Sequence, residues 1–157
     1  MRKINVGQTV GILANVGVIA GIVFLLFELQ QNREMMRAQT RNELSMGIVD
    51  FLTVVADNGE LASLRRRADR AEELTEEEMY RYQILTRALF RYWENVHYQY
   101  RLGSYDEAEF LQQRQAWASY AENSKAMVDH WCQIGDEFSH GFAAEMNSVL
   151  TVYQCQD

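Results

Sequence analysis

The chain has 157 residues, of which 48% are hydrophobic and 24% charged, and it contains no proline. This length suits one domain, and the lack of proline, the commonest helix breaker, favours long helices joined by short turns. The net charge of -7 argues against a general nucleic-acid-binding protein, because such proteins present clustered positive charge to the phosphate backbone. We therefore expect an all-α fold with no nucleic-acid partner.

The first expected element is a transmembrane anchor over residues 1–28. Residues 4–27 carry no charged side chain, and about 20 residues of helix cross the hydrocarbon core of a bilayer. Arg2 and Lys3 precede this run as in a cleavable signal peptide, but the run exceeds the roughly 7–15 apolar residues of a signal peptide and no A-x-A-like site follows. A buried core helix is the remaining alternative, and it would need a larger domain to cover it.

Small residues recur along one side of the anchor at spacings of three and four. They permit a second helix to approach closely, and van der Waals contact then drives association within lipid. Glycine is also common in membrane helices in general, so the pattern has a second interpretation. The candidate helix-packing residues are Gly7, Gly11, Ala14, Asn15, Gly17 and Gly21, with Asn15 offering an interhelical hydrogen bond.

The side of the membrane occupied by the rest of the chain depends on the flanking positive charges. Arg2 and Lys3 lie before the anchor, and Arg33, Arg37 and Arg41 follow it. Because cytoplasmic flanks carry an excess of lysine and arginine, these nearly equal counts decide little. A short N-terminal tail is easily translocated, so we expect a cytoplasmic domain.

The anchor is expected to continue as a helical stalk over residues 29–57, because no turn signal precedes the sequence DNG that begins at Asp57. The first part of this stalk is polar on nearly all sides. In the second part four apolar residues recur at spacings of four, three and four: Leu44, Ile48, Phe51 and Val55. This stripe should face either the core or a neighbouring subunit.

Residues 58–157 are predicted to form a small helical bundle. A first helix is expected over residues 60–74. Thr75 and Glu78 then match a capping box, which starts a long helix that stops before Gly103. Further helices follow after this glycine.

Capping signals also divide the last third of the chain. Ser104 and Glu107 repeat the capping box and start another helix. Ser124 is expected to cap the next helix, Gly135 to interrupt it and Asp136 to begin the last one.

The two cysteines, Cys132 and Cys155, are too few for a disulfide framework. They also lack the paired spacing that a zinc site needs. Their redox state, and with it the redox compartment of the protein, stays open.

Three segments of the chain resemble a group of small bacterial membrane proteins with one N-terminal anchor. They are residues 29–33 (LQQNR), residues 91–101 (RYWENVHYQYR) with Gly103, and the pair at 138–139 (FS). The resemblance covers most of the chain and implies an anchor helix followed by a helical domain, in the bacterial inner membrane. It implies no activity and no site residues.

Two Glu-x-x-His motifs are the sharpest chemical signal. In di-iron helical bundles two helices supply such motifs, and two others each supply a glutamate. The residues concerned here are Glu94 with His97, Glu137 with His140, and Glu43 and Glu109 as the added glutamates. At ~100° per residue, however, Glu94 and His140 fall about 160° from the centres of their apolar faces. We therefore expect surface ion pairs and hydrogen bonds at these positions, without a metal or other cofactor.

The long helix after Thr75 carries a candidate partner surface. Interfaces are rich in tyrosine, tryptophan and arginine, which bury a rigid apolar body while a polar tip stays satisfied. The residues of this surface are Tyr80, Arg87, Arg91, Glu94 and Tyr98. The alternative is a central helix that is enclosed by its own chain.

A second candidate surface is a basic cluster that consists of Arg65, Arg66, Arg67 and Arg70. These side chains would contact anionic headgroups if the domain folded back to a cytoplasmic leaflet. The other interpretation is a solvated face on which the arginines pair with nearby acids.

Together these features favour a membrane-anchored helical interaction protein that self-associates or serves as an accessory subunit of a membrane complex. Its expected partners are a second copy or another membrane protein, within the lipid bilayer. The sequence has no nucleophile elbow, phosphate loop or dinucleotide fingerprint, and it identifies no small-molecule substrate. Two alternatives stay open: a di-metal helical bundle, and a homo-oligomeric pore in which Asn15 would line the lumen.

Overall fold

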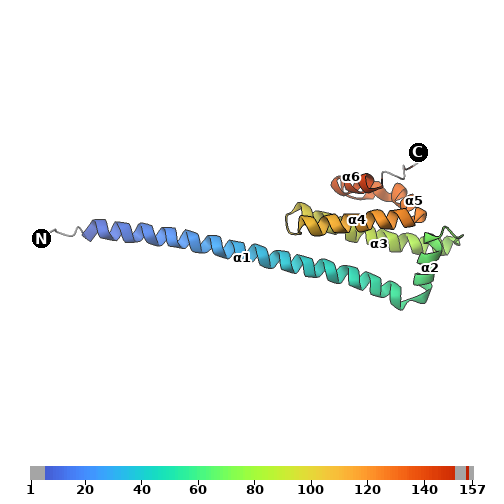
Figure 1. Cartoon of the computed structure of the whole chain (residues 1–157), viewed down its shortest axis with the longest axis horizontal. Helices are drawn as coiled ribbons and strands as arrows, with labels where there is room; N and C mark the ends of the chain where they lie inside the picture. The colour runs from blue at the N-terminus through green and yellow to red at the C-terminus, as the bar shows by residue number, and fades with distance from the viewer. Residues whose placement is uncertain (1–5, 151–154, 156–157) are drawn as a thin grey trace. The chain divides into compact units, whose positions relative to one another are not determined.

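The computed structural model describes residues 6–150 and Cys155, and these residues form an all-α fold, as expected (Figure 1). Its elements are α1 (Val6–Asp57), α2 (Gly59–Asp69), α3 (Glu76–Arg101), α4 (Glu107–Asn123), α5 (Lys125–Ile134), the 3-10 turn η1 (Gly135–Glu137) and α6 (His140–Val149). The chain divides into two compact units, Met1–Gln39 and Thr40–Asp157.

The first unit is the N-terminal part of α1, a helix of 52 residues that has no internal break. Among the described residues, α1 is the one helix that is long and apolar enough to cross a membrane. None of the residues in its most apolar stretch is buried within the chain. These apolar residues are therefore not covered by the chain's own residues, as those of a core helix within one chain would be.

The second unit includes the last part of α1. Leu44 and Val55 are buried, and Ile48 and Phe51 pack against the main hydrophobic core. The apolar stripe in the predicted stalk therefore faces the core of its own chain. The boundary between the two compact units, at Thr40, lies within the predicted stalk of residues 29–57.

Local capping signals begin and end α2 and α3. The Asn58 side chain accepts hydrogen bonds from the first turn of α2, and the capping box of Thr75 and Glu78 is present at the start of α3. Gly103, at φ 72°, follows the end of α3 as expected. The end of α2 differs from the prediction: Ala71 adopts a left-handed conformation at φ 54°, so the helix ends at Asp69. No glycine marks this turn in the sequence.

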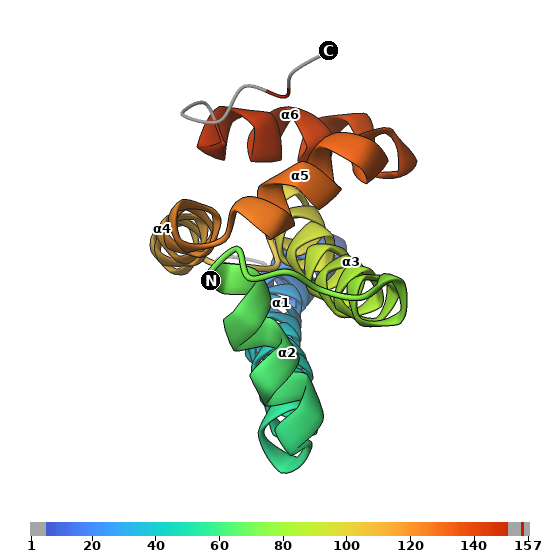
Figure 2. The ribbon, with the colours of Figure 1, turned by 90° about the vertical axis from the view of Figure 1, so that its right-hand side faces the viewer.

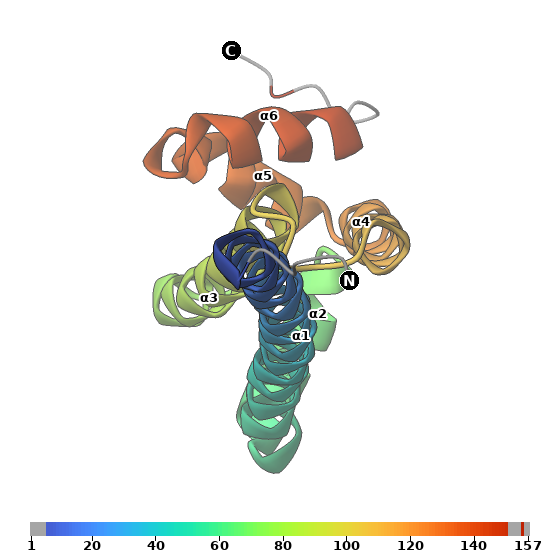
Figure 3. The same cartoon turned by 90° about the vertical axis from the view of Figure 1, so that its left-hand side faces the viewer.

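The core of the second unit lies among α3, α4, α5 and α6. Figure 1 shows α3 and α4 side by side in opposite directions, and in Figures 2 and 3 α5 lies between this pair and α6. Aromatic rings fill the space between these helices. The largest fully buried side chains are Trp117, Trp131, Tyr82, Phe90, Phe142, Met146 and Val96.

Two predicted helix starts are wrong. Asp106, and not Ser104, caps α4, because its carboxylate accepts hydrogen bonds from the first turn of that helix. The last helix begins at His140 and not at Asp136, since Phe138 is extended after the turn η1. This extended backbone lets the Phe138 ring enter the aromatic core, where it lies 5.2 Å from the Trp131 ring.

Candidate interaction surfaces

The glycine-lined face of α1 is open in the structure. A Cβ atom built on Gly11, Gly17 or Gly21 would meet no other atom within 4 Å. Gly7, Ala14 and Asn15 are exposed as well. Each position on this face therefore has space for a neighbouring helix, and the glycines keep that space next to the backbone.

The polar members of the predicted partner surface on α3 contact the chain itself. Arg87 forms an ion pair with Glu137 at 3.1 Å, and the Arg91 guanidinium lies 4.1 Å from the centre of the Phe138 ring. Arg91 also donates a hydrogen bond to the backbone carbonyl of Glu137. These arginines thus fasten the turn before α6 to α3.

Glu94 completes this attachment. Its carboxylate accepts a hydrogen bond from the backbone N–H of Ser139 at 2.8 Å and pairs with Arg91 at 2.7 Å. Burial raises the pKa of Glu94, but these hydrogen bonds outweigh burial and leave the pKa below its usual value. Ser139 makes no side-chain cap of its own, so a residue of α3 satisfies a backbone donor at the start of α6.

Two tyrosines of the predicted partner surface remain accessible. Tyr80 is 63% exposed and Tyr98 is 56% exposed. They occupy separate ends of α3, and the three polar residues between them are held by η1 and the residues that follow it. Arg87 and Arg91 are exposed as well and Glu94 is half-buried, so all five predicted residues keep accessible surface although the three polar ones also contact the chain itself.

The two Glu-x-x-His motifs do not converge. His97 is buried next to Phe110 and Phe142, whereas His140 is exposed at the start of α6. Glu43 is exposed on α1, and Glu109 pairs with Arg41 at 2.7 Å. Within residues 6–150 and Cys155, no three histidine, cysteine or carboxylate side chains lie close enough together to hold a metal ion.

Two histidines are buried, and for His97 this corrects the expectation of a surface position. His130 lies in the core with its Nδ1 atom 2.6 Å from the Thr86 hydroxyl, and His97 lies among aromatic rings. Burial lowers the pKa of both imidazoles, because a charged ring loses its hydration there. The Arg87 charge lowers the pKa of His130 further, although Glu137 opposes it.

We expect the domain to lose stability as the pH falls below about 6.5, the ordinary pKa of histidine. The folded state binds a proton at each buried imidazole less readily than the unfolded chain does, because burial lowers both pKa values, so acidification favours unfolding. Urea unfolding of the detergent-solubilised chain at about pH 7.5 and about pH 5.5 measures this change. A His140→Gln variant, which alters an exposed histidine, should show the same pH dependence. Equal stability at both pH values would contradict the prediction.

The basic cluster is largely engaged by acids. Arg67 contacts Glu78 at 2.6 Å, and its hydrogen bond lowers the pKa of Glu78 to about 2. Arg65 lies 3.8 Å from Asp69, and Arg70 lies 3.9 Å from Glu72. Arg66 is exposed. The arginines thus connect α2 to its flanking turns and to α3.

An open cleft of about 630 Å³ lies beside this cluster, between α2 and the first turns of α3. Arg67 and Arg81 contribute its basic groups. Glu78 pairs with Arg67, and both Glu77 and Glu60 lie within ion-pair distance of Arg81. Both arginines of the cleft are therefore paired with acids, and with three glutamates against two arginines the cleft presents no surplus of positive charge.

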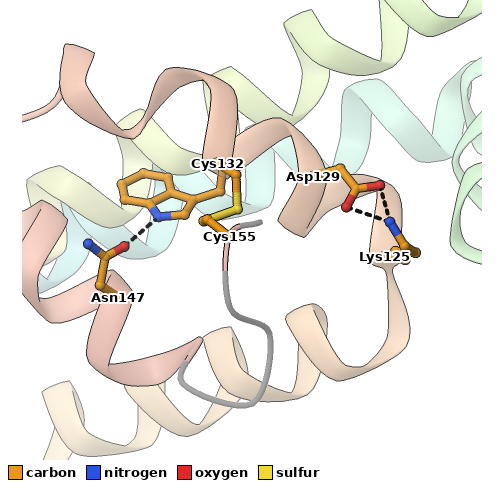
Figure 4. The surroundings of a disulfide bond; sticks show 6 residues. Lys125, Asp129, Cys132, Asn147 and Cys155 are labelled. Atoms are coloured by element: carbon orange, nitrogen blue, oxygen red, sulfur yellow. Dashed lines mark hydrogen bonds and ion pairs between the residues drawn. A yellow bond between two sulfur atoms is a disulfide. The ribbon is translucent and has the colours of Figure 1, made fainter. Parts of the chain in front are cut away.

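The clearest feature that the sequence left open is a disulfide between Cys132 and Cys155 (Figure 4). The bond closes a segment with a sequence separation of 23 residues between α5 and the C-terminal part of the chain. Nearby, the indole of Trp131 donates a hydrogen bond to the Asn147 side chain at 3.0 Å. The sequence offers one signal for this pairing: it contains two cysteines, which can pair with each other and leave no third.

No known family matches. Comparisons of the chain with family models, with curated proteins and with solved structures all found no match. Three features of the described residues bear on function: an open apolar helix, a closed aromatic core and a disulfide.

Proposed function

We propose that this chain is a single-pass membrane protein that associates with a second copy through its anchor and holds a helical interaction domain beside the membrane. The observation that carries the proposal is the apolar part of α1, in which no residue of the most apolar stretch is buried and three glycines have empty space around them. In lipid such a face gains contacts when another helix packs against it. The resemblance to small bacterial membrane proteins favours the bacterial inner membrane.

The disulfide supports a domain on the oxidising side of that membrane, in the periplasm. Disulfides form and persist in the periplasm, whereas the cytoplasm keeps cysteines reduced. Cys132 and Cys155 are bonded, and Cys132 is exposed to solvent rather than sheltered in the core. This favours the opposite side from the cytoplasmic domain that the short N-terminal tail suggested. The nearly equal positive charges on the two flanks of the anchor oppose neither orientation.

Thiol trapping tests the orientation. Cells are quenched with acid, and the denatured protein is treated with a maleimide that adds mass to each free thiol. We expect no added mass before reduction and two additions after it. Two additions without reduction, in cells that express the full chain at a low level, would place the domain in the cytoplasm.

Bulky residues in the glycine face are expected to disrupt self-association. Gly17→Leu combined with Gly21→Leu fills the space that a second helix would occupy, so the mass in mild detergent should fall from that of an oligomer to that of a monomer. Native mass spectrometry measures the change. The matched control is Val16→Leu with Val23→Leu, which adds volume at other positions of the same helix.

Two results would count against the proposal. Normal assembly after both glycine replacements would show that this face does not carry the association. A stoichiometric foreign chain in the purified complex, with no second copy, would mark the protein as an accessory subunit of another assembly.

A further inference from the structure

The last part of α1 exposes a second apolar face, on the domain itself. Leu44, Ile48, Phe51 and Val55 point to the core, yet the other side of the same helix is apolar as well. Its exposed members are Met46 at 56%, Val49 at 57%, Leu52 at 42% and Val54 at 59%. Asp50 is the only charged residue between Leu44 and Ala56. A helix that is apolar on all sides is normally covered on all sides.

The outward residues have the spacing of a helix-helix seam. At ~100° per residue, Met46 lies about 160° from Leu44 and from Ile48. Five residues lie on the same side of the helix as Met46, counting Met46 itself, and their spacings alternate between four and three. They are Asn42, Met46, Val49, Thr53 and Ala56. This alternation is that of the a and d positions of a coiled coil, with Met46 and Thr53 at a positions and Asn42, Val49 and Ala56 at d positions.

We propose that this seam, defined as Asn42, Met46, Val49, Thr53 and Ala56, pairs in parallel with the same residues of a second copy. The inference rests on the proposed self-association of the anchors. Two copies in one bilayer have the same orientation, so each residue of one seam lies at the same distance from the membrane as its counterpart in the other. In such a two-fold contact the same surface of both copies forms the interface, so the seam must fit against itself.

The charges of this segment favour a parallel copy over other occupants. Residues 42–57 contain Glu43, Asp50 and Asp57 but no lysine or arginine. Each of these acids directly follows a seam residue. In a parallel pair, each acid of one copy faces a residue of the other copy that directly precedes a seam residue. Ser45 and Leu52 are two such residues, and neither is charged. Like charges are thus kept apart, whereas an antiparallel pair would bring acids together. The same acids oppose contact with an anionic lipid surface.

The seam is too short to hold free copies together. A stable interface buries roughly 1,200–2,000 Å², far more than a seam of some 15 residues along one helix. Tethering the two copies through their anchors raises the effective concentration to the millimolar range, which makes a weak contact form. The seam therefore belongs to the membrane-held protein.

Disulfide cross-linking of the full chain tests the seam. Val49→Cys and Met46→Cys are oxidised separately in proteoliposomes, with the native disulfide left intact. The controls are Val54→Cys, which is 59% exposed on the same helix but lies outside the seam, and Leu111→Cys, which is 50% exposed on α4. We expect cross-linked dimer to form at least about tenfold faster at the seam positions, because only there do paired Cβ atoms come within roughly 3.5–4.5 Å.

The outcomes separate the seam from the anchor contact. An oligomer by native mass in which Val49→Cys links no faster than Val54→Cys would overturn the seam and leave anchor association standing. Fast linking at Val49→Cys in a protein that is monomeric by mass would count against the anchor and would overturn the inference that the seam forms only between associated anchors. Linking of Val49→Cys to a foreign chain in place of a second copy would overturn the proposal. A Val49→Glu replacement should slow linking at Met46→Cys by a similar factor.

Discussion

Replacing Trp117 with alanine is expected to remove about 3–5 kcal/mol from the free energy of unfolding of the domain. Trp117 is fully buried on α4, where its ring stacks on Trp93 at 5.5 Å and meets Phe142 edge to face at 6.0 Å. Truncation removes these contacts and leaves a cavity that fixed helices on several sides cannot close. Because typical domains are stable by only ~5–15 kcal/mol, the loss would be a large part of the total.

A second replacement at the same position separates packing from polarity. The Nε1 atom of Trp117 is buried without a hydrogen-bond partner, so Trp117→Phe removes an unsatisfied donor along with part of the ring. We expect its loss to be clearly smaller than that of Trp117→Ala. Urea unfolding followed by circular dichroism gives both values, and the exposed Leu111→Ala should stay within about 0.5 kcal/mol of the parent. Equal losses for the phenylalanine and alanine variants would contradict the role given to the indole N–H.

Removing the disulfide is expected to lower the free energy of unfolding by roughly 3 kcal/mol. The bond joins Cys132 and Cys155 across a sequence separation of 23 residues, so its loss frees a long loop in the unfolded chain. The double replacement Cys132→Ser and Cys155→Ser shows this effect as a lower urea midpoint. Reducing agent should destabilise the parent to the same extent and leave the double variant unchanged. An oxidised parent and a double variant with the same midpoint would show that the bond does not constrain the unfolded state.

Features of the fold that depend on neighbouring residues could be predicted from the sequence. The capping box at Thr75, the cap at Ser124 and the stop at Gly103 all act within one helical turn, and all three are present. The late start of the last helix is an error of another kind, because distant residues decide it. The last helix starts late because the Phe138 ring packs against Trp131 and Phe90, which belong to other helices. Helical periodicity within one segment does not contain that information.

The same distinction applies to the candidate surfaces. The small residues of the anchor share a face by spacing alone, and the structure leaves that face open. Helical periodicity placed Arg87, Arg91 and Glu94 off the apolar face of α3, but the residues that occupy them, Glu137 to Ser139, lie more than a helix away in sequence. The outward apolar side of α1 was overlooked for a different reason. In residues 44–56 the stripe that faces the core accounts for the helical spacing of apolar residues. The residues on the other sides of the same segment are nearly all apolar too.

For the proposed membrane protein, the uninterrupted backbone of α1 also bears on how the chain would be inserted during its synthesis. Because the helix has no break, side-chain polarity alone tells the insertion machinery where the lipid segment ends, at the polar residues after Phe27. A second apolar stretch follows at 44–56, which covers only about 20 Å at ~1.5 Å per residue and is too short for a hydrocarbon core of ~30 Å. Under the proposed anchoring, length rather than hydrophobicity would thus decide which stretch is retained in lipid and which is released to fold in water.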